Sequence, residues 1–129
     1  MNTQFSDVIE SFHSSFADKK EIPESLEQFW LKKAIAEYGV EIENLEYDAD
    51  LCEFNSVVDQ YVIDTIALMM KVMYLQRDYS RVNKIASIVG KDLSVNGTNG
   101  LQKYTKDELT ETKIELSERL DNLKPSAYN

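Results

Sequence analysis

Residues 54–79 read FNSVVDQYVIDTIALMMKVMYLQRDY and form a nearly continuous apolar run. Apolar and small side chains recur in it at steps of three and four residues, which predicts an α-helix. They also fill most of the gaps between those steps, so the apolar surface is too broad for a helix that buries a single stripe. We therefore predict a central hydrophobic helix over about 55–79 that other helices cover on several sides.

Asp59, Gln60, Asp64 and Lys71 interrupt the apolar part of this run. The run therefore never reaches the roughly 18 uncharged residues that a membrane span requires. We expect a soluble core helix and no membrane partner.

The chain has 129 residues, of which 43% are hydrophobic and 29% charged, with four glycines and two prolines. These values are typical of one globular domain and leave little room for a sheet-rich architecture. We predict a single helical domain over 1–129, an all-α fold in which about four to five helices form a compact bundle around the central helix.

Two helices are predicted before the central one. Over about 3–17, one face carries Phe5, Val8, Ile9, Phe12 and Phe16. This amphipathic pattern suits a helix in the core, which we favour, or a mobile arm that packs on a neighbour.

The second helix opens at Pro23, which suits a first turn, and Gly39 is placed to cap its end. Its predicted buried face consists of Leu26, Phe29, Trp30, Ala34, Ile35 and Tyr38.

The segments around the central helix are predicted from turn and cap signals. Residues 40–53 alternate apolar and acidic side chains, which indicates a loop with a brief strand or turn, and Asn55 or Ser56 is expected to cap the central helix. Thr105 and Glu108 form a capping box that predicts the start of a last helix. Its buried face is expected to hold Leu109, Thr112, Leu116, Leu120 and Leu123, before a loose tail at 126–129.

Residues 91–102, KDLSVNGTNGLQ, contain two Asn-Gly pairs, each of which favours a turn. We predict a long Gly/Asn-rich loop or β-hairpin arm over about 91–103. Its residues are Asp92, Leu93, Ser94, Val95, Asn96, Gly97, Asn99 and Gly100.

The net charge of −9 argues against a general nucleic-acid binder, because phosphate affinity depends largely on Lys and Arg. The charge is unevenly distributed along the chain. Seven carboxylates and no cation lie between residues 37 and 53: Glu37, Glu41, Glu43, Glu46, Asp48, Asp50 and Glu53. Cations dominate from Lys71 to Lys106, where the surface candidates are Arg77, Arg81, Lys84, Lys91, Lys103 and Lys106.

Two interpretations of the basic zone stay open. In the first, the cations only keep an exposed face hydrated. In the second, they contact an anionic surface, either nucleic acid or the acidic zone of another copy of the chain. Two complementary patches on one subunit create a head-to-tail contact, which closes into a ring or continues as a filament.

The residues offer little for catalysis, and we expect no enzyme activity, no cofactor and no metal. His13 is the only histidine and is expected on a partly exposed helix face rather than as a general base. Cys52 is the only cysteine and lies among carboxylates, which suppress thiolate reactivity. The acidic zone lacks the ordered spacing of a calcium loop, so we interpret it as a solvated face. The first ten residues lack the pattern of a signal peptide, so we expect an intracellular protein.

A resemblance to a known family adds to this interpretation. The run RVNKIASIVGKDLSVNGTNG (81–100) and the ending LDNLKPSAYN (120–129) resemble the head-tail connector (adaptor, or head-completion) proteins of tailed bacteriophages and prophages. The similarity lies in the plan of several helices with a long loop after the central one. It also includes a short serine-containing segment within that loop, here residues 91–95.

This resemblance implies a ring of identical subunits between the phage portal protein and the tail. The ring would help close the filled head, contact a tail-side completion or stopper protein, and line the channel through which double-stranded DNA passes. It implies assembly in the cytoplasm of a bacterial host, followed by a place at the head-tail interface of the virion. The alternative is a small acidic phage-encoded regulatory protein that binds a basic partner.

Overall fold

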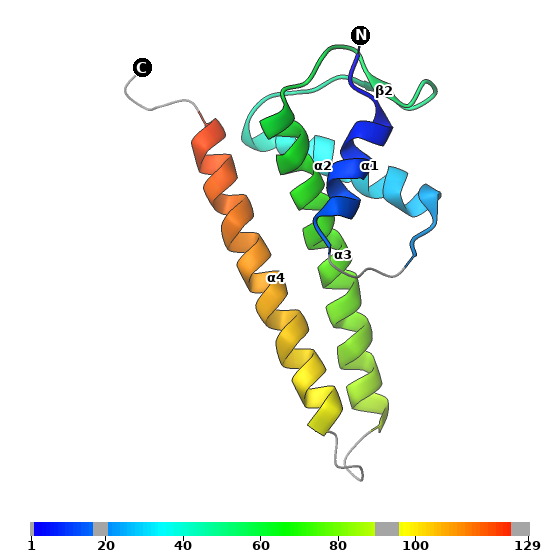
Figure 1. Ribbon diagram of the computed structural model, residues 1–129, viewed down its shortest axis with the longest axis vertical. Helices are drawn as coiled ribbons and strands as arrows, with labels where there is room; N and C mark the ends of the chain where they lie inside the picture. The colour runs from blue at the N-terminus through cyan, green and yellow to red at the C-terminus, as the bar shows by residue number, and fades with distance from the viewer. Residues whose placement is uncertain (1, 17–20, 90–95, 125–129) are drawn as a thin grey trace.

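The computed structural model describes residues 2–16, 21–89 and 96–124. Within these ranges the elements follow the order α1 (Phe5–Ser14), α2 (Glu24–Glu41), β1 (Tyr47–Asp48), β2 (Glu53–Phe54), α3 (Gln60–Val89) and α4 (Asn96–Leu123) (Figure 1). The prediction of a mostly helical chain is confirmed. No helix in the described ranges has both the length and the apolar character needed to cross a membrane.

The central position of α3 is also confirmed. Residues 65–70 are six consecutive buried residues, and α1, α2 and α4 all pack against this helix. The helix begins at Gln60 rather than near residue 55, so its predicted start was wrong, and it continues past Tyr79 to Val89. The residues just before the helix form hydrogen bonds with the N-terminal segment instead. The Ser56 carbonyl accepts a hydrogen bond from the Thr3 amide at 3.1 Å, and the Val58 amide donates to Thr3 Oγ1 at 2.8 Å.

Helix α1 belongs to the core, as the favoured interpretation had it. Phe5, Val8 and Phe12 are buried, and the Phe12 ring lies edge-on to that of Trp30, with 6.4 Å between the ring centroids. Phe16, just after the helix, packs edge-on against Tyr74 of α3 at 4.9 Å.

Helix α2 buries a face that differs from the predicted one. Trp30, Ala34 and Tyr38 are buried as expected, but Phe29 is 50% exposed and Leu31 is fully buried. At 100° per residue Phe29 points away from the line through these buried positions, and the helix cannot bury both sides. Gly39 lies inside the helix, which ends only at Glu41, so its predicted role as a cap was wrong.

The predicted brief strand between α2 and α3 is a small antiparallel hairpin. Tyr47 pairs with Phe54, and Asp48 with Glu53. The N-terminus lies along the other edge of β2: the Phe54 amide donates to the Thr3 carbonyl at 2.7 Å, and the Phe5 amide donates to the Cys52 carbonyl at 2.8 Å.

The predicted loop or hairpin arm over 91–103 was wrong for its second half. Residues 96–103 form the first two turns of α4, so both Asn-Gly pairs lie in a helix, while residues 90–95 fall outside the described ranges. Thr105 is buried inside this helix, so the predicted helix start at Thr105 was wrong. The reason is packing against α3: Gln102 Nε2 donates to Asn83 Oδ1 at 2.9 Å, and Val82 and Thr105 are both buried in this half of the helix pair.

Only one half of the molecule therefore forms the expected compact bundle. Helices α1 and α2 surround the first half of α3, whereas the second half of α3 and the first half of α4 extend beyond them as an antiparallel pair (Figure 1). At 1.5 Å per residue α3 is about 45 Å long. The face predicted for the last helix is confirmed, since Leu109 and Thr112 are buried and Leu116, Leu120 and Leu123 pack against the core.

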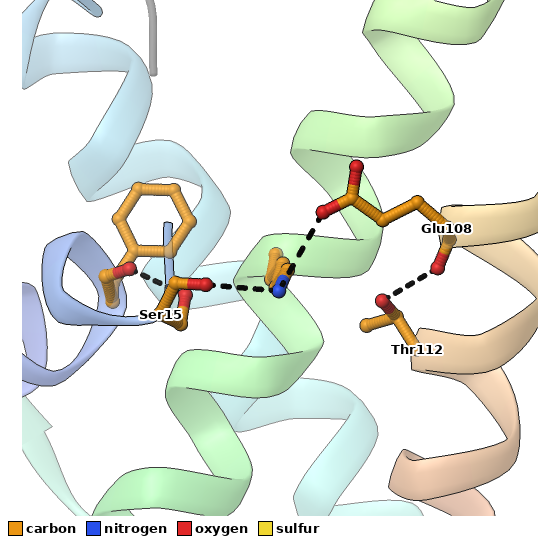
Figure 2. A network of polar contacts seen from close by, with 5 residues as sticks. Ser15, Glu108 and Thr112 are labelled. Atoms are coloured by element: carbon orange, nitrogen blue, oxygen red, sulfur yellow. Dashed lines mark hydrogen bonds and ion pairs between the residues drawn. The ribbon is translucent and has the colours of Figure 1, made fainter. Parts of the chain in front are cut away.

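Lys71 joins three helices at the point where α1 ends. Its Nζ donates to the Ser15 carbonyl at 3.0 Å and lies 3.9 Å from Glu108 Oε1 of α4. Figure 2 shows Ser15 and Glu108 on either side of α3. The same Nζ is 5.1 Å from the centre of the Phe16 ring, and only 14% of the side chain is exposed. A cation next to the last carbonyls of α1 is also favoured by the helix dipole.

Replacing Lys71 by Met should therefore loosen the end of α1 while keeping the aliphatic stem. We expect the free energy of unfolding to fall by about 1–2 kcal/mol, because a charged hydrogen bond is lost and the Ser15 carbonyl loses this donor. Urea denaturation measures the change. Lys103→Met is the control, since Lys103 is exposed and should change stability by no more than about 0.5 kcal/mol. Equal effects of the two variants would contradict the role given to Lys71.

Substitutions at Gly100 test whether the first turns of α4 are helical. In a helix, Gly100→Ala should raise the free energy of unfolding by about 1 kcal/mol, and Gly100→Pro should lower it by about 3 kcal/mol. In a loop arm that makes no helical hydrogen bonds, both changes would be small. Urea denaturation of the two variants distinguishes the helix from the arm.

Candidate functional site

The carboxylates of residues 37–53 gather at one end of the molecule. They lie on the last turns of α2, on the connection after it and on the β1–β2 hairpin, all near the start of α3 (Figure 1). Five are exposed and two are partly buried. We call this set the acidic end: Glu37, Glu41, Glu43, Glu46, Asp48, Asp50 and Glu53.

Little of this negative charge is neutralised within the chain. Glu41 Oε2 lies 3.2 Å from Lys124 Nζ, which is the only ion pair of the acidic end among the described residues. Asp48 has a structural role, because its Oδ1 accepts the amides of Asp50 at 2.9 Å and Leu51 at 3.2 Å. Most of the acidic end is therefore available to a partner.

The described basic residues lie on the second half of α3 and the first half of α4, with Arg77 and Arg81 beside the start of α2 and Lys84 and Lys103 farther along the pair. The exposed ones, which we call the basic end, are Arg77, Arg81, Lys84, Lys103 and Lys106. Arg81 is paired with Asp78 of its own helix at 2.9 Å. Lys91 falls outside the described residues. The structure thus places the two sets of charges toward opposite ends of an elongated molecule (Figure 1).

Sequence reasoning missed the exposed apolar residues that accompany both sets. At the acidic end Val40 is 86%, Leu51 67% and Val57 71% exposed, and on the basic half Ile85 is 42% and Tyr104 66% exposed. Apolar residues at the centre of a charged surface are a common feature of protein interfaces. The sequence contained a partial indication of this exposure, because Val40 and Tyr104 are not on the predicted buried faces.

A surface hollow of about 330 Å³ lies where the start of α2 meets the middle of α3. It is lined by Glu21, Ile22, Tyr74, Arg77, Asp78 and Arg81. Ile22 is buried and Tyr74 partly buried, and both supply apolar surface, whereas the four other residues are charged. The hollow suits a small apolar side chain flanked by charge.

The hairpin turn is held firmly against α2. Tyr47 Oη donates to Gln28 Oε1 at 3.2 Å, and Gln28 Nε2 donates to Cys52 Sγ at 3.4 Å. Cys52 has φ 55°, a left-handed conformation that is uncommon for any residue except glycine. Burial, followed by the neighbouring Cys52, raises the pKa of Tyr47 to about 12. Cys52 is thus a structural part of the turn.

His13 connects α1 to α2. Its Nε2 lies 2.6 Å from Glu27 Oε2, and the Glu27 side chain is only 8% exposed. A buried carboxylate needs such a partner. Across residues 2–16, 21–89 and 96–124, no three His, Cys, Asp or Glu side chains are grouped so that they could hold a metal ion.

Comparison with family models, with curated proteins and with solved structures finds no significant match. The similarity to head-tail connectors therefore depends only on the sequence segments quoted above and stays a prediction.

The raised pKa of Tyr47 predicts how stability responds to alkali. The unfolded chain releases this proton near pH 10 and the folded chain near pH 12, so the free energy of unfolding should fall as the pH rises through this interval. Tyr47→Phe should show a smaller fall over the same interval. Urea denaturation at pH 9, 10 and 11 provides the measurement, and an identical pH dependence in both proteins would contradict the assignment.

Proposed function

We propose that this protein is a non-enzymatic virion assembly protein that forms a ring between the phage portal and the tail. In this role it closes the filled head, bridges head to tail and lines the DNA exit channel. The observation that carries the proposal is the separation of an acidic end and a basic end on one elongated chain. The resemblance of residues 81–100 and 120–129 to head-tail connectors supplies the biological setting.

The charge separation supports assembly for a physical reason. Different and complementary surfaces on one subunit give a contact that each added copy offers again, so the copies close into a ring or continue as a filament. Attraction between the ends also speeds encounter and disfavours the contacts that place like charges together. Each contact is weak in salt, which suits a subunit that assembles only on a template holding many copies.

The basic end also supports the DNA part of the proposal. Five exposed cations give transient contact with phosphates, while the net charge of −9 prevents tight general binding. Weak contact of this kind suits a channel through which DNA must pass quickly.

The acidic end favours a second candidate, a small regulatory protein that masks a basic partner. Val40, Leu51 and Val57 are exposed among carboxylates there, and this combination alone suits a basic surface with apolar pockets. In this case the basic end has no function in binding.

Electron microscopy of the protein mixed with the portal ring encoded beside it tests the first candidate. We expect an additional ring of density on the tail-proximal end of the portal. A charge-reversed variant, with Glu43, Glu46 and Asp50 all changed to Lys, should add no ring. Changing Lys84 and Lys103 to Glu in that variant should restore part of the assembly, because the contact then has the opposite polarity at both ends.

Two results would contradict the proposal. Bare portals at high concentrations of the unaltered protein would favour the regulatory candidate, and a stoichiometric complex with a basic host or phage protein would then be sought by pull-down. Normal rings from the charge-reversed variant would show that the charged ends do not make the contact.

A further inference from the structure

The turn of the β1–β2 hairpin presents an apolar side chain in a fixed position. Leu51 is 67% exposed at the tip, next to the exposed Asp50. Hydrogen bonds hold the rest of the turn: Asp48 Oδ1 accepts two amides of the turn, and Gln28 Nε2 of α2 donates to Cys52 Sγ. An apolar group held rigidly in solvent loses little conformational entropy when it binds, which makes it suited to docking.

The hollow beside α3 offers a matching surface. Ile22 and Tyr74 provide apolar contact, and Arg77 stands at its side. Asp78 is already paired with Arg81, whereas Arg77 has no ion-pair partner among the described residues. Glu21 is a carboxylate of the same hollow and repels an acidic group, so the docked carboxylate is expected on the Arg77 side.

We infer that the hairpin turn of one copy docks into the α2–α3 hollow of a second copy, with Leu51 on Ile22 and Tyr74 and with Asp50 beside Arg77. This inference deepens the proposed function and rests on it, because it names the contact between neighbouring subunits on which the ring depends.

Charge and the position of the turn both point to a second copy as the occupant. The turn carries the exposed Asp50, and Arg77 of the hollow has no ion-pair partner among the described residues, so these two groups of different copies complement each other. Within one chain the turn does not occupy the hollow, because none of the residues that line the hollow comes from the hairpin and Cys52 is hydrogen-bonded to Gln28 of α2. A contact between unlike surfaces then leaves a free turn at one end and a free hollow at the other.

A pair of charge-reversal variants tests the contact. Asp50→Lys places a second cation opposite Arg77, and Arg77→Glu places a second carboxylate opposite Asp50, so each variant alone should lose self-association. A mixture of the two brings a positive turn to a negative hollow and should associate again. Asp50 and Arg77 are exposed, so neither change should disturb folding.

The readout is a zero-length carbodiimide crosslink, mapped by mass spectrometry at low salt. It joins the lysine introduced at position 50 of one variant to the glutamate introduced at position 77 of the other. We expect roughly tenfold more of this intermolecular product in the mixture than in either variant alone.

Two controls separate this contact from general attraction between charges. Glu10→Lys makes a comparable charge change on an exposed part of α1, and its new lysine should not crosslink to position 77 of the Arg77→Glu variant. Leu51→Ser added to the Asp50→Lys chain should reduce the crosslinked product, whereas Val40→Ser should not.

A mixture that gives no crosslink between positions 50 and 77 above the level of the Glu10→Lys control overturns the inference. This result is separate from the portal experiment. Rings on the portal without the crosslink would leave the proposed function standing with a different contact, and this docking contact would be wrong. A crosslink without portal binding would support the docking contact and show that the copies associate for another purpose.

Discussion

The structure depends on the need to cover α3 on every side. Residues 65–70 are buried without interruption, so their side chains point in all directions around the helix and no single partner can cover them. Helices α1, α2 and α4 each take one part of this surface. Apolar burial of this kind is the dominant favourable contribution to folding, and it explains why the first half of α3 is the centre of the molecule.

Polar contacts then fix how the covering helices are placed. Lys71 joins the end of α1 to α4, His13 joins α1 to the buried Glu27 of α2, and the Arg119 guanidinium stacks 4.7 Å from the centre of the Tyr61 ring where α4 returns to the start of α3. Such contacts add modest stability, but their directional geometry selects one arrangement among several that would bury the same apolar area.

Among the described residues, α4 is the main partner of the second half of α3, and this difference separates the two charged surfaces (Figure 1). The core half carries the hairpin and the acidic end, while the basic end lies on the second half of α3 and the first half of α4. A chain that is acidic on average thus presents two opposite electrostatic ends. The proposed assembly role rests on this arrangement, since a head-to-tail contact between identical copies requires two different, complementary surfaces on each copy.

The sequence by itself determined the helical class, the central helix, the buried face of α4 and the segregation of charge along the chain, because hydrophobic period and composition are local properties. Only the tertiary structure decided that α4 begins at Asn96, since packing on α3 outweighs the turn preference of two Asn-Gly pairs. It also decided that Phe29 is exposed and Leu31 buried, because a helix with apolar residues on several faces buries the one that meets its neighbour. The same holds for the docking surfaces: the exposure of Leu51 and the hollow beside Tyr74 depend on residues that are distant in sequence, and no local pattern predicts how such residues meet.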